Sequence, residues 1–513
     1  MLPMATLLLL LLASNPSPPY VRGRNGVPTL PAIKDVDTAV ENRQPILLTS
    51  SPWPASKDLA AWTPASITKL VPELGPVRIG TDASAGAHEF WNVDFGVARD
   101  DEASPNGFRP VRLSNELVNA TMPTERFWAP RSAESDAVHY YSGSLLEDDG
   151  RASVPDLQRG LDELVAILGR DPEGLPRRSQ PARHFLKVWL GTEGATTPLH
   201  YDTQHNVYAQ LSGTKEFWLL PPYAARHDVP LYPSVHPLSH FMRDSGPGSF
   251  DRLAAATSVK SATDCWDRES HRGRCMLTFR LEAGDVLYLP PFWLHRATCR
   301  STCVSANVWV SSHAMHRMED VEAMPLPFES EWALPVRYAA VLAFLRALLR
   351  WVHAEEQGRS DEMHRLPPPP PGGVWFPPKA LTPVETVSSL LSTRWQRAED
   401  VLLRKRADGP SSAHALAAAA ECEPRADEDA AGLDLVKIEE YAQRRAVALG
   451  VEEEPVYNEA ERSWRGPKLI LLHDQLERIT HWATGGDTAA THALLRRLKQ
   501  CVAPTGTAPH DEL

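Results

Sequence analysis

The sequence predicts a mainly β (α+β) fold, in which a β sandwich or barrel follows mixed α/β elements and precedes a helical region. Three observations lead to this prediction. Short β-rich runs crowd into residues 184–310, tight turns separate several of them, and beyond residue 312 the apolar spacing becomes helical. The chain of 513 residues is long enough for two or three domains.

The amino-terminal region predicts a leader followed by α/β elements. The apolar run MATLLLLLLA, residues 4–13, is too short for a spanning helix of about 20 residues. With the Pro-rich segment after it, this run resembles the core of a secretory signal peptide, which we place at residues 1–19. A membrane-anchored or disordered start is the alternative. Further on, strand-like pieces at 45–51 and 77–80 flank a Trp-rich helix near 53–71.

The β core is expected at residues 184–310. Its predicted strands are 184–191, 206–211, 215–220, 275–281, 285–290 and 304–310. We expect Ser212-Gly213-Thr214 and Glu282-Ala283-Gly284-Asp285 to be hairpin loops. The polar stretch 223–274 is too long for an ordinary connection, so it is predicted to be an insertion near a site.

The carboxy-terminal part is predicted to be helical, with an extension at 313–363, a Pro-rich linker at 364–380 and a helical region at 381–506. The apolar stretch 333–354 carries three arginines, so a packing helix is favoured over a membrane span. Further helices are expected near 384–406, 433–449 and 467–501. Their apolar stripes indicate a packing module or a homodimer interface.

Charge and end signals narrow the setting of the protein. The 65 acidic and 53 basic residues leave a net charge of -12 without a basic block, which argues against a nucleic-acid partner. The chain ends in His510-Asp511-Glu512-Leu513, the HDEL address read by a receptor in the endoplasmic reticulum. Both ends together predict a resident of the endoplasmic reticulum lumen.

Cysteine usage is compatible with that oxidising lumen. We expect the close pairs Cys265/Cys275 and Cys299/Cys303 to form disulfides, with free buried thiols as the alternative. Asn119 lies in a sequon for N-glycosylation.

A candidate metal site begins in TPLHYDTQHN, residues 197–206. His200 and Asp202 are two positions apart, so on a strand both would point to one face of a barrel. A strand that runs into Pro290-Pro291 ends on His295, the second histidine. Two histidines and one carboxylate leave three coordination positions open, the arrangement of non-haem Fe(II) oxygenases. Expected to be loop or surface groups are His205, His227, His236, His240 and His271.

The open positions suit 2-oxoglutarate as co-substrate, because its 1-carboxylate and keto oxygen could take two and O2 the third. Its far carboxylate needs a cation and hydroxyl donors if it is buried. Lys215, at the start of KEFWLL, is the candidate cation, and Thr197 offers a hydroxyl at the same end of the pocket.

The segments TPLHYDTQHNVYAQLSGTK, EAGDVLYLPPFWLH and SANVWV resemble the JmjC-type cupin-like (cupin-8) family of Fe(II)- and 2-oxoglutarate-dependent oxygenases. The likeness is greatest to its small protein-hydroxylase branch, which includes the asparaginyl hydroxylase that acts on hypoxia-inducible factor. It covers about residues 30–312 and implies a double-stranded β-helix (jelly-roll/cupin) barrel. Arg296 follows the last ligand where many relatives have a second histidine, so substrate-side details are less defined.

The resemblance also assigns roles to individual residues. It implies Fe(II) bound by His200, Asp202 and His295, with the 5-carboxylate of 2-oxoglutarate held by Lys215 and Thr197. It implies that Asn206 and Asn307 line the co-substrate or O2 side and that Tyr140 adds a hydroxyl, with Tyr141 as its alternative.

The expected function is therefore a dioxygenase, aided by ascorbate, that hydroxylates a side chain of a protein or peptide in the secretory pathway. Two other readings stay open. One is a catalytically inactive lumenal binding or scaffold protein, and the other is a cupin that uses another metal without 2-oxoglutarate. The second would require neither Lys215 nor Thr197.

Overall fold

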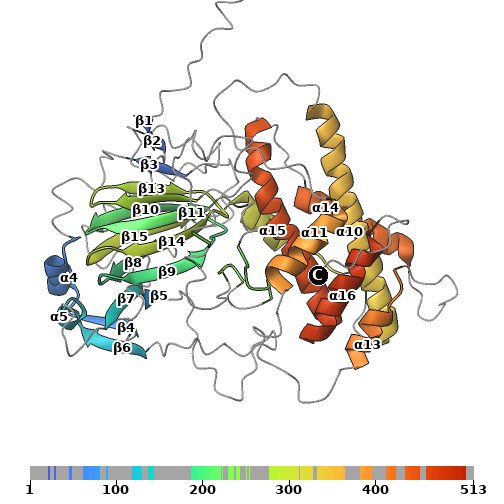
Figure 1. The fold of residues 1–513 in the computed structure, drawn as a ribbon, viewed down its shortest axis with the longest axis horizontal. Coiled ribbons are helices and arrows are strands. Elements are labelled where there is room, and N and C mark those ends of the chain that lie inside the picture. The colour runs from blue at the N-terminus through green and yellow to red at the C-terminus, as the bar shows by residue number, and fades with distance from the viewer. Residues whose placement is uncertain are drawn as a thin grey trace, which may run out of the picture.

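A computed structural model of the chain shows a body of strands beside a group of helices (Figure 1). It describes residues 21–22, 28–30, 45–48, 62–80, 88–89, 118–129, 137–143, 186–220, 222, 229–235, 239–242, 250, 253–254, 276–310, 312–326, 328, 332–363, 382–395, 412–422, 434–450 and 458–503.

The larger sheet runs in the order β1-β2-β3-β13-β10-β15-β8-β7-β4-β6. Its neighbouring strands are antiparallel except β2 and β3. The strands are β1 (Val21–Arg22), β2 (Pro28–Leu30), β3 (Ile46–Leu48), β4 (Glu73–Gly80), β6 (Val118–Pro123), β7 (Val138–Gly143), β8 (Leu186–Gly191), β10 (His205–Ser212), β13 (Val286–Leu289) and β15 (Cys303–Val310).

The smaller sheet runs in the order β12-β11-β14-β9-β5. Its strands are β5 (His88–Glu89), β9 (Ala195–His200), β11 (Lys215–Leu220), β12 (Leu277–Leu281) and β14 (Leu294–Cys299). The sequence did not predict β9 and β14 as strands. The two carry Pro198 and the polar run His295-Arg296, which weaken an apolar β signal, although both strands are almost wholly buried.

The short turns of the core connect the two sheets rather than neighbouring strands, so the predicted hairpins are wrong. Residues 213–214 lead from β10 in the large sheet to β11 in the small one, and Glu282–Asp285 lead from β12 back to β13. Turn residues such as Gly213, with φ of 71°, permit a sharp reversal but do not specify which sheet the next strand joins. This alternation between sheets gives a jelly-roll barrel, as expected for the cupin-like fold class.

The sheets bury different side chains on their two faces. On β10, Val207, Ala209 and Leu211 point to the outer face of the large sheet. That face is covered by helices α4 (Pro64–Leu70) and α5 (Thr124–Phe127), and α4 is capped by Thr63. Between the sheets lies a second core that includes Trp189, Tyr208, Phe217, Leu219, Leu281 and Leu287. The side chains that face the barrel interior thus include an apolar core between the two sheets.

The helices beyond the barrel pack on one another and on the insertion. They are α9 (His313–Ala323), α10 (Leu334–Met363), α11 (Pro383–Leu390), the π-helix η6 (Leu391–Trp395), α13 (Ser412–Ala419), α14 (Leu435–Gly450), α15 (Asn458–Ala483) and α16 (Thr488–Cys501). The single helix expected at 467–501 is two, because Gly485 and Gly486 have φ of 64° and 82° and end α15. No described helix, α10 included, is long and apolar enough to cross a membrane.

Two disulfides join described residues. Cys299–Cys303 connects β14 to β15, which confirms that predicted pair. Cys422–Cys501 ties the segment after α13 to the end of α16 and was not foreseen, because its partners are 79 residues apart.

Several predictions lie wholly or largely outside the described residues. They are the signal peptide at 1–19, the linker at 364–380, the tetrapeptide 510–513, the pair Cys265/Cys275 and much of the insertion 223–274.

Candidate metal centre

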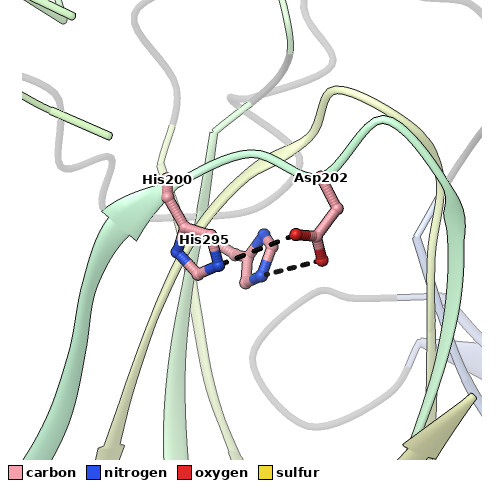
Figure 2. Close-up of side chains that lie close together, drawn as sticks. All are labelled: His200, Asp202 and His295. Carbon is pink, nitrogen blue, oxygen red and sulfur yellow. Dashed lines mark ion pairs between the residues drawn. The ribbon is translucent and has the colours of Figure 1, made fainter. Parts of the chain in front are cut away.

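The three predicted metal ligands meet at one end of the barrel. His200 is the last residue of β9, Asp202 follows in the connection to β10, and His295 is the second residue of β14. In the antiparallel pairing of β14 with β9, His295 stands directly opposite His200. Figure 2 shows the two imidazoles and the carboxylate turned toward one another. Asp202 is thus past the strand, and His295 is near the beginning of its strand, not the end as the sequence suggested.

Local backbone irregularities bring the ligands into this position. The register between β14 and β9 shifts between His295 and Ala297, and such a bulge redirects neighbouring side chains. Phe292 has φ of 65°, rare for a bulky residue, and its amide donates to the carbonyl of Asp202 at 2.7 Å. A strained turn next to the site therefore ties the segment before β14 to the segment after β9.

The donor atoms are close enough to share one ion. One ligand atom from each residue lies within 4.8 Å of the others. The carboxylate oxygens of Asp202 are 3.9 Å from Nε2 of His200 and 3.7 Å from Nε2 of His295. Both imidazoles are buried, and their rings lie 4.2 Å apart between centroids.

Hydrogen bonds set the tautomer that a metal needs. Nδ1 of His200 lies 2.8 Å from the carbonyl of Pro198, and Nδ1 of His295 lies 3.0 Å from the carbonyl of Trp293. A carbonyl only accepts, so each Nδ1 carries the proton and each Nε2 offers its lone pair to the centre of the site. This donor set fits a divalent transition metal with open coordination positions.

Burial and mutual charge also favour the ligand form of these groups. Burial, reinforced by the nearby His295, lowers the pKa of His200 to about 3, so its imidazole is neutral at neutral pH. Burial alone would raise the pKa of Asp202, but the facing imidazoles of His295 and His200 outweigh it and lower that pKa. Next to His295, the site therefore holds a neutral His200 imidazole and an ionised Asp202 carboxylate.

A chain of hydrogen bonds fixes the carboxylate of Asp202. Its Oδ2 accepts from Nδ2 of Asn206 at 3.1 Å and from the indole of Trp309 at 2.9 Å. Asn206 in turn accepts from Nδ2 of Asn307 at 3.0 Å, and Asn307 accepts from the indole of Trp189 at 2.6 Å. Asn206 and Asn307 are thus placed as supports of a metal ligand. The hydrogen bonds of Trp309 and Trp189 were not foreseen from the sequence. Trp309 shares a strand face with Asn307, two residues before it, and Trp189 shares one with Lys187.

A second polar group lies deeper in the barrel around Lys215. Its ammonium is buried and donates to the hydroxyl of Tyr208 at 2.6 Å and to Oγ of Ser305 at 3.2 Å. Burial lowers the pKa of Lys215 to about 7. Tyr208 and Ser305 were not foreseen, although Tyr208 shares a strand face with Asn206.

Thr197 and Tyr140 complete this group. The hydroxyls of the two residues are 2.9 Å apart. Burial raises the pKa of Tyr140 to about 12, so its phenol stays protonated. Tyr141 packs instead in the outer core, which places Tyr140 and not its alternative inside the barrel.

His205 is not the loop or surface group expected, whereas His240 lies, as expected, in a loop, at a half-buried turn of the insertion. His205 begins β10, is fully buried, and its Nδ1 lies 2.9 Å from the hydroxyl of Tyr288. As the neighbour of Asn206 on a strand, His205 points away from the site. His240 of the insertion lies 6.3 Å from His200 between ring centroids, and the next residue, Phe241, stacks on His200 at 4.9 Å. His227, His236 and His271 lie outside the described residues.

A jelly-roll barrel that holds two imidazoles and a carboxylate at one end is a cupin-type metal centre. Residues 36–315 match the family of the cupin-like domain, and the chain belongs to this family.

The similar curated proteins are JmjC-type enzymes and their relatives. The bifunctional peptidase and (3S)-lysyl hydroxylase JMJD7 of Homo sapiens is 27% identical over 162 residues, which cover 30% of this chain and 47% of the relative. The lysine-specific demethylase JMJ30 of Arabidopsis thaliana is 30% identical over 130 residues, 25% of this chain and 26% of the relative. The tRNA wybutosine-synthesizing protein 5 of Danio rerio is 28% identical over 206 residues, 38% of this chain and 55% of the relative. The matches thus span less than half of the first two relatives. Together with the domain match, they support a relationship to a family of 2-oxoglutarate-dependent oxygenases, whose members normally use Fe(II).

Proposed function

We propose that this protein is an Fe(II)- and 2-oxoglutarate-dependent dioxygenase that hydroxylates a protein side chain in the endoplasmic reticulum lumen. The observation that carries the proposal is the combination inside one barrel of the triad His200, Asp202 and His295 with the buried cation Lys215. A site for metal alone would have no use for a lysine in the barrel interior, because burying a cation costs free energy unless it has a partner.

Each part of the site has a distinct task in this function. The triad would hold Fe(II), which when bound supplies the activation of O2. Lys215 would pair with the far carboxylate of 2-oxoglutarate, and the hydroxyls of Tyr208, Thr197 and Tyr140 surround the space where such an anion needs donors. The apolar core between the sheets keeps bulk water away from this end of the barrel.

A protein substrate is the choice that the relatives favour. The human relative is named as a lysyl hydroxylase and three Arabidopsis relatives as lysine-specific demethylases. A net charge of -12 argues against a nucleic-acid substrate. The short apolar leader and the terminal HDEL support the lumenal location.

The direct test is succinate formation by purified protein with Fe(II), ascorbate and 2-oxoglutarate, with and without lumenal extract. We expect extract-stimulated turnover that His200→Ala abolishes. Arg280→Ala, which changes an exposed side chain on β12, is the matched control and should keep full activity. If wild type binds Fe(II) and 2-oxoglutarate without turnover, the inactive binding protein is the better description. Absence of binding refutes the proposal.

Location is tested separately. Removal of residues 510–513 should release the protein into the medium of expressing cells, whereas full-length chain stays inside and moves with lumenal markers. Cytosolic, unprocessed chain in both cases would refute the lumenal assignment.

A further inference from the structure

A buried ion pair in the helical region lies next to the metal centre. Nη1 of Arg394, on η6, is 3.2 Å from Oε2 of Glu477, on α15. The side chains are only 2% and 0% exposed. A pair this deep is costly to desolvate and is no stability device in itself, since apolar residues of similar size often do as well. Its partners indicate what else it does. A π-helical turn such as η6 is rare and is often found at functional sites.

One partner of the pair is the insertion that covers the site. The backbone amide of Ser234 donates to the carboxylate of Glu477, and the hydroxyl of Ser234 is 3.5 Å from the carbonyl of Asp474. A few residues further along, Phe241 stacks on His200, and the amide of Met242 donates to the carbonyl of Leu199 at 2.8 Å. The described part of this insertion is therefore fixed at one end to α15 and at the other to β9, next to a metal ligand.

The other partner is Tyr201, the residue between His200 and Asp202. Arg394 lies beside the phenol of Tyr201, where its positive charge opposes the rise in pKa that burial causes in that phenol. The ring of Tyr201 stacks on Phe292 at 5.5 Å, and its amide donates to the carbonyl of His240 at 3.1 Å. Tyr201 is 7% exposed, so its side chain is held by the groups packed around it. Because Tyr201 stands between His200 and Asp202 in the chain, contacts that fix it also restrain the backbone between the two ligands.

We propose that Arg394 and Glu477 are positioning residues of the metal centre, which hold Tyr201 and the insertion segments 229–235 and 239–242 and thereby set the spacing of His200 and Asp202. This deepens the proposed function and rests on its metal site. In this proposal the helical region does more than pack or dimerise, because it contributes the buried charges Arg394 and Glu477, which orient residues 200–202. Residues that orient ligands in this way typically change metal affinity by about 10- to 100-fold when they are replaced.

The test is Co(II) binding by the full-length, metal-free protein. Calorimetric titration measures the affinity, and the visible absorption of bound Co(II) reports the geometry of its ligands. Tyr201→Phe removes one oxygen and keeps the ring stacked on Phe292. Glu477→Gln keeps an acceptor for Ser234 and removes the charge that balances Arg394. The matched control is Thr491→Val, which removes an equally buried hydroxyl from α16, where it is bonded to Thr484 at 2.7 Å.

We expect Tyr201→Phe and Glu477→Gln to weaken Co(II) binding about tenfold or more and to shift the Co(II) spectrum, while Thr491→Val leaves both unchanged. If the Glu477→Gln chain does not fold, Tyr201→Phe decides the matter. Folded variants with wild-type affinity and spectrum would overturn the inference, as would equal losses in Thr491→Val. Wild type that binds Co(II) but never forms succinate refutes the proposed function alone, whereas wild type that binds no Co(II) refutes both.

Discussion

The lysine inside the barrel makes stability depend on pH in a defined window. Burial lowers the pKa of Lys215 from 10.5 to about 7. Below pH 7 the folded and unfolded chains both hold the proton, and the cost of burying the charge is fully present. Between pH 7 and 10.5 the unfolded chain binds more protons, so stability rises with pH. With about 1.4 kcal/mol for each pKa unit, the gain from pH 7 to pH 9 is about 2 kcal/mol.

Lys215→Met has a similar volume without the charge, so it should lose this gain. Urea unfolding of metal-free protein at pH 7, 8 and 9, monitored by tryptophan fluorescence, measures it as the difference between wild type and variant. Titrations common to both chains cancel in that difference. Lys187→Met, which removes a half-buried lysine from β8 of the large sheet, should keep the wild-type slope. Parallel pH profiles for wild type and Lys215→Met would refute the reasoning.

Other predictions concern the metal ligands and the disulfide. Asp202→Ala should weaken Co(II) binding by more than about 100-fold, because it removes the only charged ligand of the described triad; retained binding in calorimetry would mean that another group supplies the ligand. Trp309→Phe deletes one donor to that carboxylate and should cost about tenfold in affinity, so an unchanged Kd would contradict the hydrogen-bond chain. Cys501→Ser opens a bridge between residues 79 apart and should lower stability by about 4 kcal/mol; a Tm equal to that of the oxidised wild type would show that Cys422–Cys501 adds nothing.

The fold class and the candidate metal-binding triad were predictable because their signals are local. Short β-rich runs between turn residues identified β8, β10, β11, β12, β13 and β15. The spacing of His200 and Asp202 with His295 identified a candidate ligand set that the structure brings together. Lys215 was predicted because the buried far carboxylate of 2-oxoglutarate would need a cation as its partner. These inferences need only neighbours in sequence or the chemistry of a known ligand set.

What the sequence could not supply depends on contacts between distant segments. The turns at Gly213 and Gly284 predict reversals equally well within a sheet or between sheets, so the partners of each strand stayed undetermined. The approach of His240 to His200 requires the path of the insertion, and the pairing of Arg394 with Glu477 joins positions 83 residues apart. No periodicity marks such a pair, because each residue alone looks like an ordinary charge on a helix.

The register of β14 on β9 determines when the candidate metal site is complete. His200 and Asp202 lie near the beginning of the core barrel sequence, but His295 stands opposite His200 only once β14, which comes about 95 residues later, has paired with β9. A chain interrupted after β11 carries two ligands and cannot complete the triad. Slippage of β14 by one residue would turn His295 to the other side of the sheet. The complete triad therefore exists only when β14 has paired with β9 in the observed register, so a metal bound by all three residues would report that alignment.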